Sequence, residues 1–226
     1  MRRSRRYIEN AGKVDREKHY SIAEALQVLK SFRPCKYDET VEVVMKLGVD
    51  PKKAEQAIRG SVSLPKGLGK TVRVVVFADG ALAEEAKKAG AIEAGGEDLA
   101  KKVEGGWMEF DVAIAHPTMM SRVGKLGRIL GPKGLMPSPK SGTVTPDVVK
   151  VLKEFAAGKV EYRTDTGGNV HAPVGKVGFK AEDLEENIRA FTEHIRASRP
   201  ATTKGTFVEQ VYLSTSMGPG VLLETA

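Results

Sequence analysis

The sequence is poor in cysteine: Cys35 is the only one among 226 residues. A single cysteine excludes an internal disulfide framework and a cysteine-rich zinc site, and it suits a reducing compartment. The four histidines, His19, His116, His171 and His194, are scattered, and no two of them have the spacing of metal ligands. We therefore expect no metal, no cofactor and no catalytic residues.

Long apolar runs are also missing. The arginine-rich start, residues 2–6, resembles the first part of an export signal, but polar residues follow within three positions of Tyr7. We expect no signal peptide, and no stretch approaches the ~18 apolar residues of a membrane helix. The basic arm is either a solvated segment or one that contacts phosphates, and the sequence leaves both interpretations open.

One segment matches the motif of a phosphate-binding loop only in part. Gly69-Lys70-Thr71 matches the end of such a loop, but the glycine expected five residues earlier is replaced by Leu64. The loop should also follow a strand and begin a helix, whereas an apolar run typical of a strand follows here. No glycine-rich dinucleotide motif comes after that run either, so nucleotide binding is not expected.

Positive charge is in excess. Lys and Arg number 36 against 29 Asp and Glu, for a net charge of +7. The excess lies in the first two thirds of the chain: residues 1–67 carry 15 basic and 9 acidic side chains, and residues 68–159 carry 14 and 11. Residues 160–226 carry 7 and 9. This balance favours a polyanionic partner.

Hydrophobic periodicity predicts helices and strands with two different hydrophobicity patterns. The ends of the chain show amphipathic helices and half-exposed strands, whereas the middle shows continuous apolar runs typical of buried parallel strands. The expected helices cover residues 22–33, 51–60, 81–89, 97–103, 118–129, 147–155 and 181–196, and the expected strands cover 41–47, 72–77, 110–115, 160–163, 169–172 and 207–213. The strands at 160–163 and 169–172 are expected to form a hairpin around Gly167-Gly168.

The matching hydrophobicity pattern of the two ends predicts an α/β protein of two domains. Residues 1–67 and 159–226 would form a discontinuous α+β domain, and residues 68–158 an inserted Rossmann-like domain with three layers. Neither end of the chain is long enough to form a stable hydrophobic core alone. The two chain crossings, near Gly67 and Gly158, would form a paired hinge.

One segment of the middle part is free of acidic residues. No Asp or Glu lies between Asp111 and Asp147. Glycines and prolines surround four cations within this stretch, and such a preformed loop suits phosphates with little sequence readout. The cations are Lys125, Arg128, Lys133 and Lys140. A structural turn with solvated cations explains the pattern equally well.

A second candidate surface combines both ends of the chain. Alternation places polar side chains on the outer face of the strand at 41–47, and hydroxyls, a methionine and a glycine end the last strand. These groups suit contacts to the 2′-hydroxyls and base edges of RNA. An ordinary polar sheet face is the alternative. The candidate RNA-binding residues are Lys36, Tyr37, Thr40, Glu42, Lys46, His171, Ser214, Thr215, Ser216, Met217 and Gly218.

Long blocks of the sequence resemble one known family. The blocks are residues 36–43, 62–70, 125–137, 169–176, 187–191 and 216–219, in order along nearly the whole chain. They are similar to bacterial large-subunit ribosomal protein one, the family of the mobile stalk beside the tRNA exit site. Tyr37 stands where that family usually has Phe, and Ser216 where it usually has Thr.

The resemblance implies a split domain that binds stalk rRNA and a similar structure in the protein's own messenger. It carries the site over to the two strand ends at residues 36–42 and 216–218. It further implies a cytoplasmic protein on the large ribosomal subunit, a monomer when free of the ribosome, that assists release of deacylated tRNA. The four loop cations would then make a secondary RNA or tRNA contact. Two other readings of the chain are an α/β enzyme acting on a phosphorylated small molecule and a free translational repressor.

Overall fold

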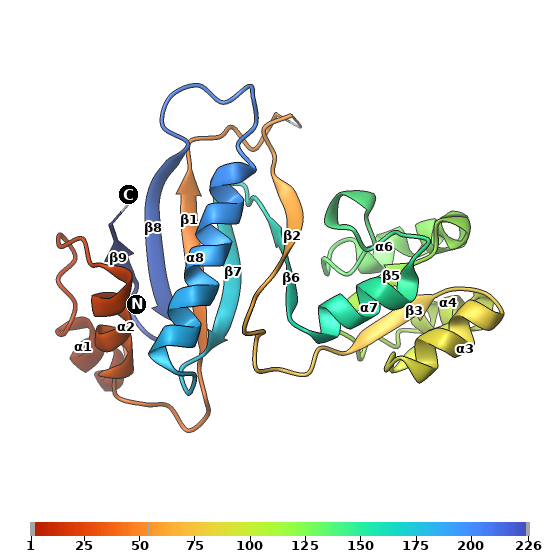
Figure 1. The fold of residues 1–226 in the computed structure, drawn as a ribbon, viewed down its shortest axis with the longest axis horizontal. Helices are drawn as coiled ribbons and strands as arrows, with labels where there is room; N and C mark the ends of the chain where they lie inside the picture. Colours follow the sequence, from red (N-terminus) through yellow and green to blue (C-terminus); the bar gives the residue numbers. More distant parts are fainter. Residues whose placement is uncertain (1–2, 54, 225–226) are drawn as a thin grey trace. The chain divides into compact units, whose positions relative to one another are not determined.

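The computed structural model describes residues 3–53 and 55–224 and contains helices and sheets of both kinds of pairing, which confirms the α/β class (Figure 1). The chain forms two compact units. Unit 1 consists of the residues up to Gly69 together with those from Val160 onward, and unit 2 consists of Lys70–Lys159. No described helix is both long and apolar enough to span a bilayer.

Unit 1 is built around a four-stranded antiparallel sheet in the order β7-β1-β8-β9, with a separate two-stranded sheet of β2 and β6. Its helices are α1 (Arg5–Ala11), α2 (Ile22–Lys30) and α8 (Ala181–Ala197), and its strands are β1 (Thr40–Leu47), β2 (Arg59–Ser63), β6 (Lys159–Arg163), β7 (Asn169–Lys176), β8 (Val208–Thr215) and β9 (Val221–Leu223).

The central strand of that sheet is β1, which pairs with β7 on one side and β8 on the other. Its residues alternate between the two faces, because successive side chains of a strand point in opposite directions. Val41, Val43, Met45 and Leu47 are buried against helices α2 and α8. Figure 1 shows α8 lying across one face of the sheet. The residues of β1 that alternate with the buried ones are half-buried or exposed, so they point to the opposite face.

A buried asparagine of α8 holds the end of the first chain segment in place. The Asn187 side chain is fully buried and accepts a hydrogen bond from the Lys66 amide at 3.0 Å. It donates to the carbonyls of Gly67 at 3.0 Å and Val174 at 2.8 Å. This amide therefore satisfies three backbone groups from two segments, the end of the first chain segment and β7.

Unit 2 contains a parallel sheet in the order β4-β3-β5. Its elements are β3 (Val74–Phe77), α3 (Ala81–Lys88), β4 (Glu93–Gly95), α4 (Glu97–Glu104), β5 (Val112–Ala115), η1 (Pro117–Met119), α5 (Met120–Val123), η2 (Gly124–Leu126), α6 (Gly127–Leu130), η3 (Pro139–Ser141) and α7 (Val148–Ala156). Two apolar clusters lie on opposite faces of the sheet. Val75 and Phe77 pack with α4 and α5, while Val74 and Val76 pack with α7 and α3.

Two expected elements of unit 1 are wrong. The helix expected over 51–60 is instead a series of turns among the described residues of 50–58, followed by strand β2 from Arg59. In these turns the Asp50 carboxylate accepts from the Lys52 amide. The expected hairpin is reduced to a single antiparallel bridge, Thr164–Val170, around the turn at Gly167-Gly168, because β6 pairs with β2 and β7 pairs with β1. Sequence periodicity identifies a strand but not its partner, because pairing is decided by segments far away in the chain.

The helix expected over 118–129 is broken into four short turns, η1, α5, η2 and α6. Gly124 and Gly127 interrupt it, since glycine weakens a helix interior by about 1 kcal/mol. The basic arm is partly helical: Ser4 caps α1 by accepting from the Tyr7 amide at 3.3 Å. Arg2 of the arm lies outside the described residues. The short strands β4 and β9 were not expected.

We expect unit 1 to fold without unit 2, because β2 and β6 pair with each other and Asn187 holds the Lys66–Gly67 backbone inside unit 1. Replacing residues 70–158 by a flexible Gly-Ser linker should leave a chain with cooperative thermal unfolding. Circular dichroism at increasing temperature measures this. A sloping, non-cooperative signal from the shortened chain would show that the two units do not fold separately.

Candidate RNA-binding site

The open face of the large sheet carries polar side chains in rows across three strands. Glu42 of β1 lies opposite Ser214 of β8, and Val44 lies between His171 of β7 and Tyr212 of β8. At one end of β1, Thr40 lies opposite Lys176, whose ammonium donates to the Thr40 hydroxyl at 2.9 Å. All these side chains are half-buried or exposed, so they form a largely polar surface that Val44 interrupts.

The turn that follows β8 is bonded to the start of β1. The Ser216 amide donates to the Thr40 carbonyl at 3.0 Å, and the Thr40 amide donates to the Ser216 hydroxyl at 3.1 Å. The Gly218 amide closes the turn on the Thr215 carbonyl. A Cβ on Gly218 would lie 2.4 Å from the Thr215 hydroxyl oxygen and 3.2 Å from the Phe32 ring, so the close approach requires glycine.

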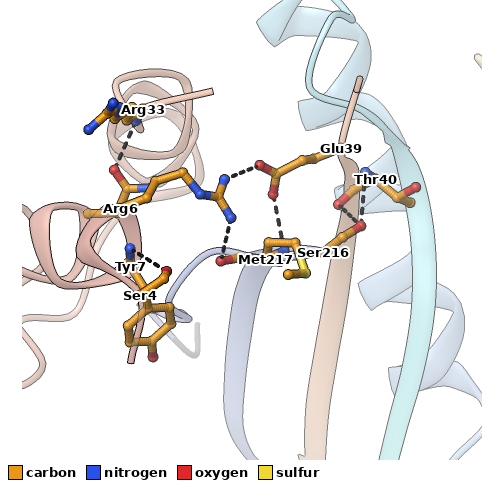
Figure 2. Close-up of polar contacts among 9 residues, drawn as sticks. Ser4, Arg6, Tyr7, Arg33, Glu39, Thr40, Ser216 and Met217 are labelled. Atoms are coloured by element: carbon orange, nitrogen blue, oxygen red, sulfur yellow. Dashed lines mark hydrogen bonds and ion pairs between the residues drawn. The ribbon is translucent and has the colours of Figure 1, made fainter. Parts of the chain in front are cut away.

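A buried carboxylate connects this turn to helix α1. Arg6 donates to Glu39 at 2.8 Å and also to the Met217 carbonyl, while the Met217 amide donates to Glu39 at 3.1 Å (Figure 2). Burial of this carboxyl group favours its neutral form. Hydrogen bonds from Cys35, Thr215, Arg6 and the Met217 amide outweigh burial and lower the pKa of Glu39 to about 2.

Two large apolar side chains stand exposed beside this carboxylate. Met217 is 53% exposed and Tyr37 is 55% exposed, which is unusual for side chains of this size. The Met217 amide bonds to Glu39, which fixes the turn that carries this methionine. Lys36, next to Tyr37, is also exposed. This end of the sheet therefore presents a flexible methionine side chain on one segment and an aromatic ring with a neighbouring cation on another.

Two of the expected residues lie farther along the same face and are paired with acids. Lys46 lies six residues beyond Thr40 in β1, roughly 20 Å away at strand spacing. Its ammonium is 2.7 Å from a Glu209 carboxylate oxygen. His171 lies 3.3 Å from Asp165. Burial opposes ionisation of Asp165, but hydrogen bonds from Asn169, His171 and the Gly167 amide lower its pKa to about 2.

The four cations of the acid-free segment lie in unit 2. Lys125, Arg128, Lys133 and Lys140 are all exposed, and none makes an ion pair within the described chain. Leu126 and Leu130 fix the segment by packing into the apolar cluster on one face of the parallel sheet. Among the residues that the structure describes, no group of three histidine, cysteine or acidic side chains could hold a metal ion.

Residues 29–219 match the model of the Ribosomal protein L1p/L10e family. The chain belongs to this family. The resemblance inferred from the sequence blocks is thus confirmed. Membership makes the chain an rRNA-binding protein of the large ribosomal subunit, located in the cytoplasm, in a family of structural ribosomal proteins rather than enzymes.

For this ribosomal family member, sequence reasoning missed three parts of the strand-end arrangement. Arg6 and Glu39 hold the turn that carries Met217, and Lys176 bonds to Thr40. The available signal for Glu39 was its position: it continues the buried face of β1, where a carboxylate requires a cation. That cation could not be assigned to Arg6 among several neighbouring arginines.

Glu39 should make the stability of this L1-family chain depend on pH. Its pKa is about 2 in the folded protein against an ordinary value of 4.5, so its contribution is complete above pH 4.5 and is lost as pH falls toward 2. The contribution is at most about 3 kcal/mol. Glu39→Gln should lower the free energy of unfolding at pH 7 and flatten its decline between pH 4.5 and 2.5, as measured by urea titration.

The matched control for that measurement is Glu193→Gln, at an exposed glutamate of α8. Asp111 and Asp165 also have pKa values near 2, so they add a pH dependence of their own to the stability of every chain. The wild type, Glu39→Gln and Glu193→Gln all retain these aspartates, so the difference between each variant and wild type reports on the substituted glutamate alone. Equal pH dependence in wild type and Glu39→Gln would show that the carboxylate does not stabilise the fold through these hydrogen bonds.

Proposed function

We propose that the strand-end turn and the open face of β7, β1 and β8 are the surface with which this ribosomal protein binds stalk rRNA. The observation that carries the proposal is the pair of exposed side chains, Tyr37 and Met217, at the end of a sheet face whose side chains are half-buried or exposed. Exposed aromatic and flexible apolar groups next to hydroxyls suit folded RNA, which offers base faces, base edges and 2′-hydroxyls.

Each group of the surface has a chemical role in this proposal. Lys36 neutralises phosphate, and Tyr37 stacks on an unstacked base. Ser214 and the backbone around Gly218 bond to 2′-hydroxyls and sugar edges. Glu42 accepts hydrogen bonds from base amino groups or 2′-hydroxyls, since a carboxylate is an acceptor only. Lys46 and His171 contribute at the other end after exchanging their acidic partners for RNA.

The proposal assigns a different role to unit 2. Residues 1–67 and 159–226 act as the rRNA-binding domain, and residues 68–158 act as a domain that moves with the stalk and assists release of deacylated tRNA. The four exposed cations of unit 2 make its contact with tRNA chiefly through charge. The same strand-end surface binds the protein's own messenger and represses its translation, and the free protein is a monomer.

Met217→Asp should weaken binding to stalk rRNA by at least about 2 kcal/mol, or roughly thirtyfold, because a new carboxylate would meet phosphates or lie unpaired in a dry contact. Filter-binding titration measures the change. Ile92→Asp is the matched control, since Ile92 is 51% exposed and lies in unit 2. Wild-type affinity for a folded Met217→Asp chain would remove the strand end from the RNA surface.

Replacing Lys125, Arg128, Lys133 and Lys140 together by Ala should change the rate of tRNA release from the exit site and leave affinity for stalk rRNA unchanged. Each lost phosphate contact lowers the salt dependence of tRNA binding by somewhat less than one unit of slope. Release is followed on reconstituted ribosomes, beside a titration of the free protein with stalk rRNA.

The control for the quadruple change removes the same charge from the other face of the same sheet. Lys87, Lys88, Lys150 and Lys153 are exposed on α3 and α7. Replacing these four by Ala should leave release as in wild type. If the loop variant instead loses rRNA affinity and leaves release unchanged, the roles of the two units are reversed.

A further inference from the structure

A basic groove lies beside the strand-end turn, between helix α1 and the segment before β1. It has a volume of about 690 Å³, within the range of ligand-binding clefts. Its lining includes Arg5, Arg6, Glu9, Arg33, Lys36 and Tyr37. Tyr37 thus belongs both to this groove and to the proposed rRNA surface. The groove depends on α1, which lies outside residues 29–219 of the family match.

The groove is preformed, because α1 is fixed by three contacts. Ser4 caps its first turn, and Arg6 bonds to the buried Glu39 (Figure 2). Near the other end of α1, the buried Asn10 side chain accepts a hydrogen bond from the Arg33 amide at 2.9 Å. The helix is therefore held against the chain that leads into β1, and its arginines are presented in fixed positions.

The cations of the groove differ in how firmly they are paired. Arg6 is committed to Glu39, with only 19% of its side chain exposed. Arg33 faces Glu9 at 3.0 Å, but both side chains are more than half exposed, so this pair contributes little and can open. Arg5 and Lys36 make no ion pair within the described chain. Three cations of the groove, Arg5, Arg33 and Lys36, are consequently available to a ligand, and Glu9 is the one carboxylate beside them.

We propose that this groove holds the sugar–phosphate backbone of the RNA strand that continues from the strand-end contact, an inference that rests on the proposed function. Arg5, Arg33 and Lys36 bind its phosphates, and guanidinium groups suit them because they donate in a planar fork. Because Tyr37 belongs to both surfaces, it determines where the RNA strand enters the groove. A base stacked on the tyrosine ring places the next phosphates over Lys36 and Arg33. The basic arm thereby extends the RNA surface without reading sequence.

Removing the two arginines that lie outside the Glu39 network tests this. Arg5→Gln combined with Arg33→Gln should reduce the slope of log affinity against log salt by about 1.5, since two phosphate contacts are lost. Affinity for stalk rRNA should fall at least fivefold near 0.1 M salt. The control is Arg163→Gln combined with Arg196→Gln, which removes the same charge from exposed positions on β6 and α8 of unit 1.

The single cysteine gives a second readout, because Cys35 also lines the groove. Its thiol bonds to Glu39, which with burial raises the pKa of Cys35, so alkylation by a maleimide is measured at mildly alkaline pH. Saturating stalk rRNA should slow alkylation of the wild-type chain several-fold. In the double arginine variant, also saturated with RNA, the protection should be largely lost.

The outcomes separate this inference from the proposed function. If Met217→Asp weakens binding while the double arginine variant keeps the wild-type salt slope and full protection of Cys35, RNA does not enter the groove and the strand-end proposal stands. If neither variant weakens binding, the strand-end proposal fails as well. A loss of affinity with an unchanged salt slope would show that the arginines act by positioning α1, which overturns the phosphate contacts.

Discussion

The buried carboxylate of Glu39 is the interaction on which the proposed RNA-binding end of this protein depends. It receives hydrogen bonds from helix α1, from the segment before β1, from the end of β8 and from the turn after β8. Removing a carboxylate from water is costly unless it is paired, and here Arg6 supplies the charge while the amide and hydroxyl donors fill the remaining positions. Segments from the two ends of the chain thus meet at one group.

The open sheet face follows from a simpler constraint. In β1 the apolar side chains occupy every second position, and helices α2 and α8 cover only the face to which these point. The positions between them, Thr40, Glu42, Val44 and Lys46, are half-buried or exposed. Because β1 is the central strand, its neighbours β7 and β8 extend that face on both sides with residues from the far end of the chain. The proposed RNA surface is thus formed by the same alternation that forms the core.

What the sequence could predict follows from how local each feature is. The alternation that places Thr40 and Glu42 outward, the capping box at Ser21 and the amphipathic α8 are local patterns, and the structure confirms them. The pairing of β6 with β2 is not local, and periodicity assigned β6 the wrong partner. The short helix α1 was hidden because an arginine run resembles a solvated arm. The RNA contacts themselves remain proposals, since side-chain exposure and charge identify a surface but not its ligand.

Anchoring by Asn187 determines where the first chain segment leaves unit 1. The leading chain stays attached to unit 1 through Gly67, and Gly69 packs so closely on Phe179 that a Cβ there would lie 2.5 Å from the ring. The next residue, Lys70, is already paired with Asp111 of unit 2. On the return path, Gly158 at φ +111° immediately precedes β6. The outgoing chain therefore changes from contacts with unit 1 to contacts within unit 2 between two consecutive residues, Gly69 and Lys70, and the returning chain enters β6 directly after Gly158.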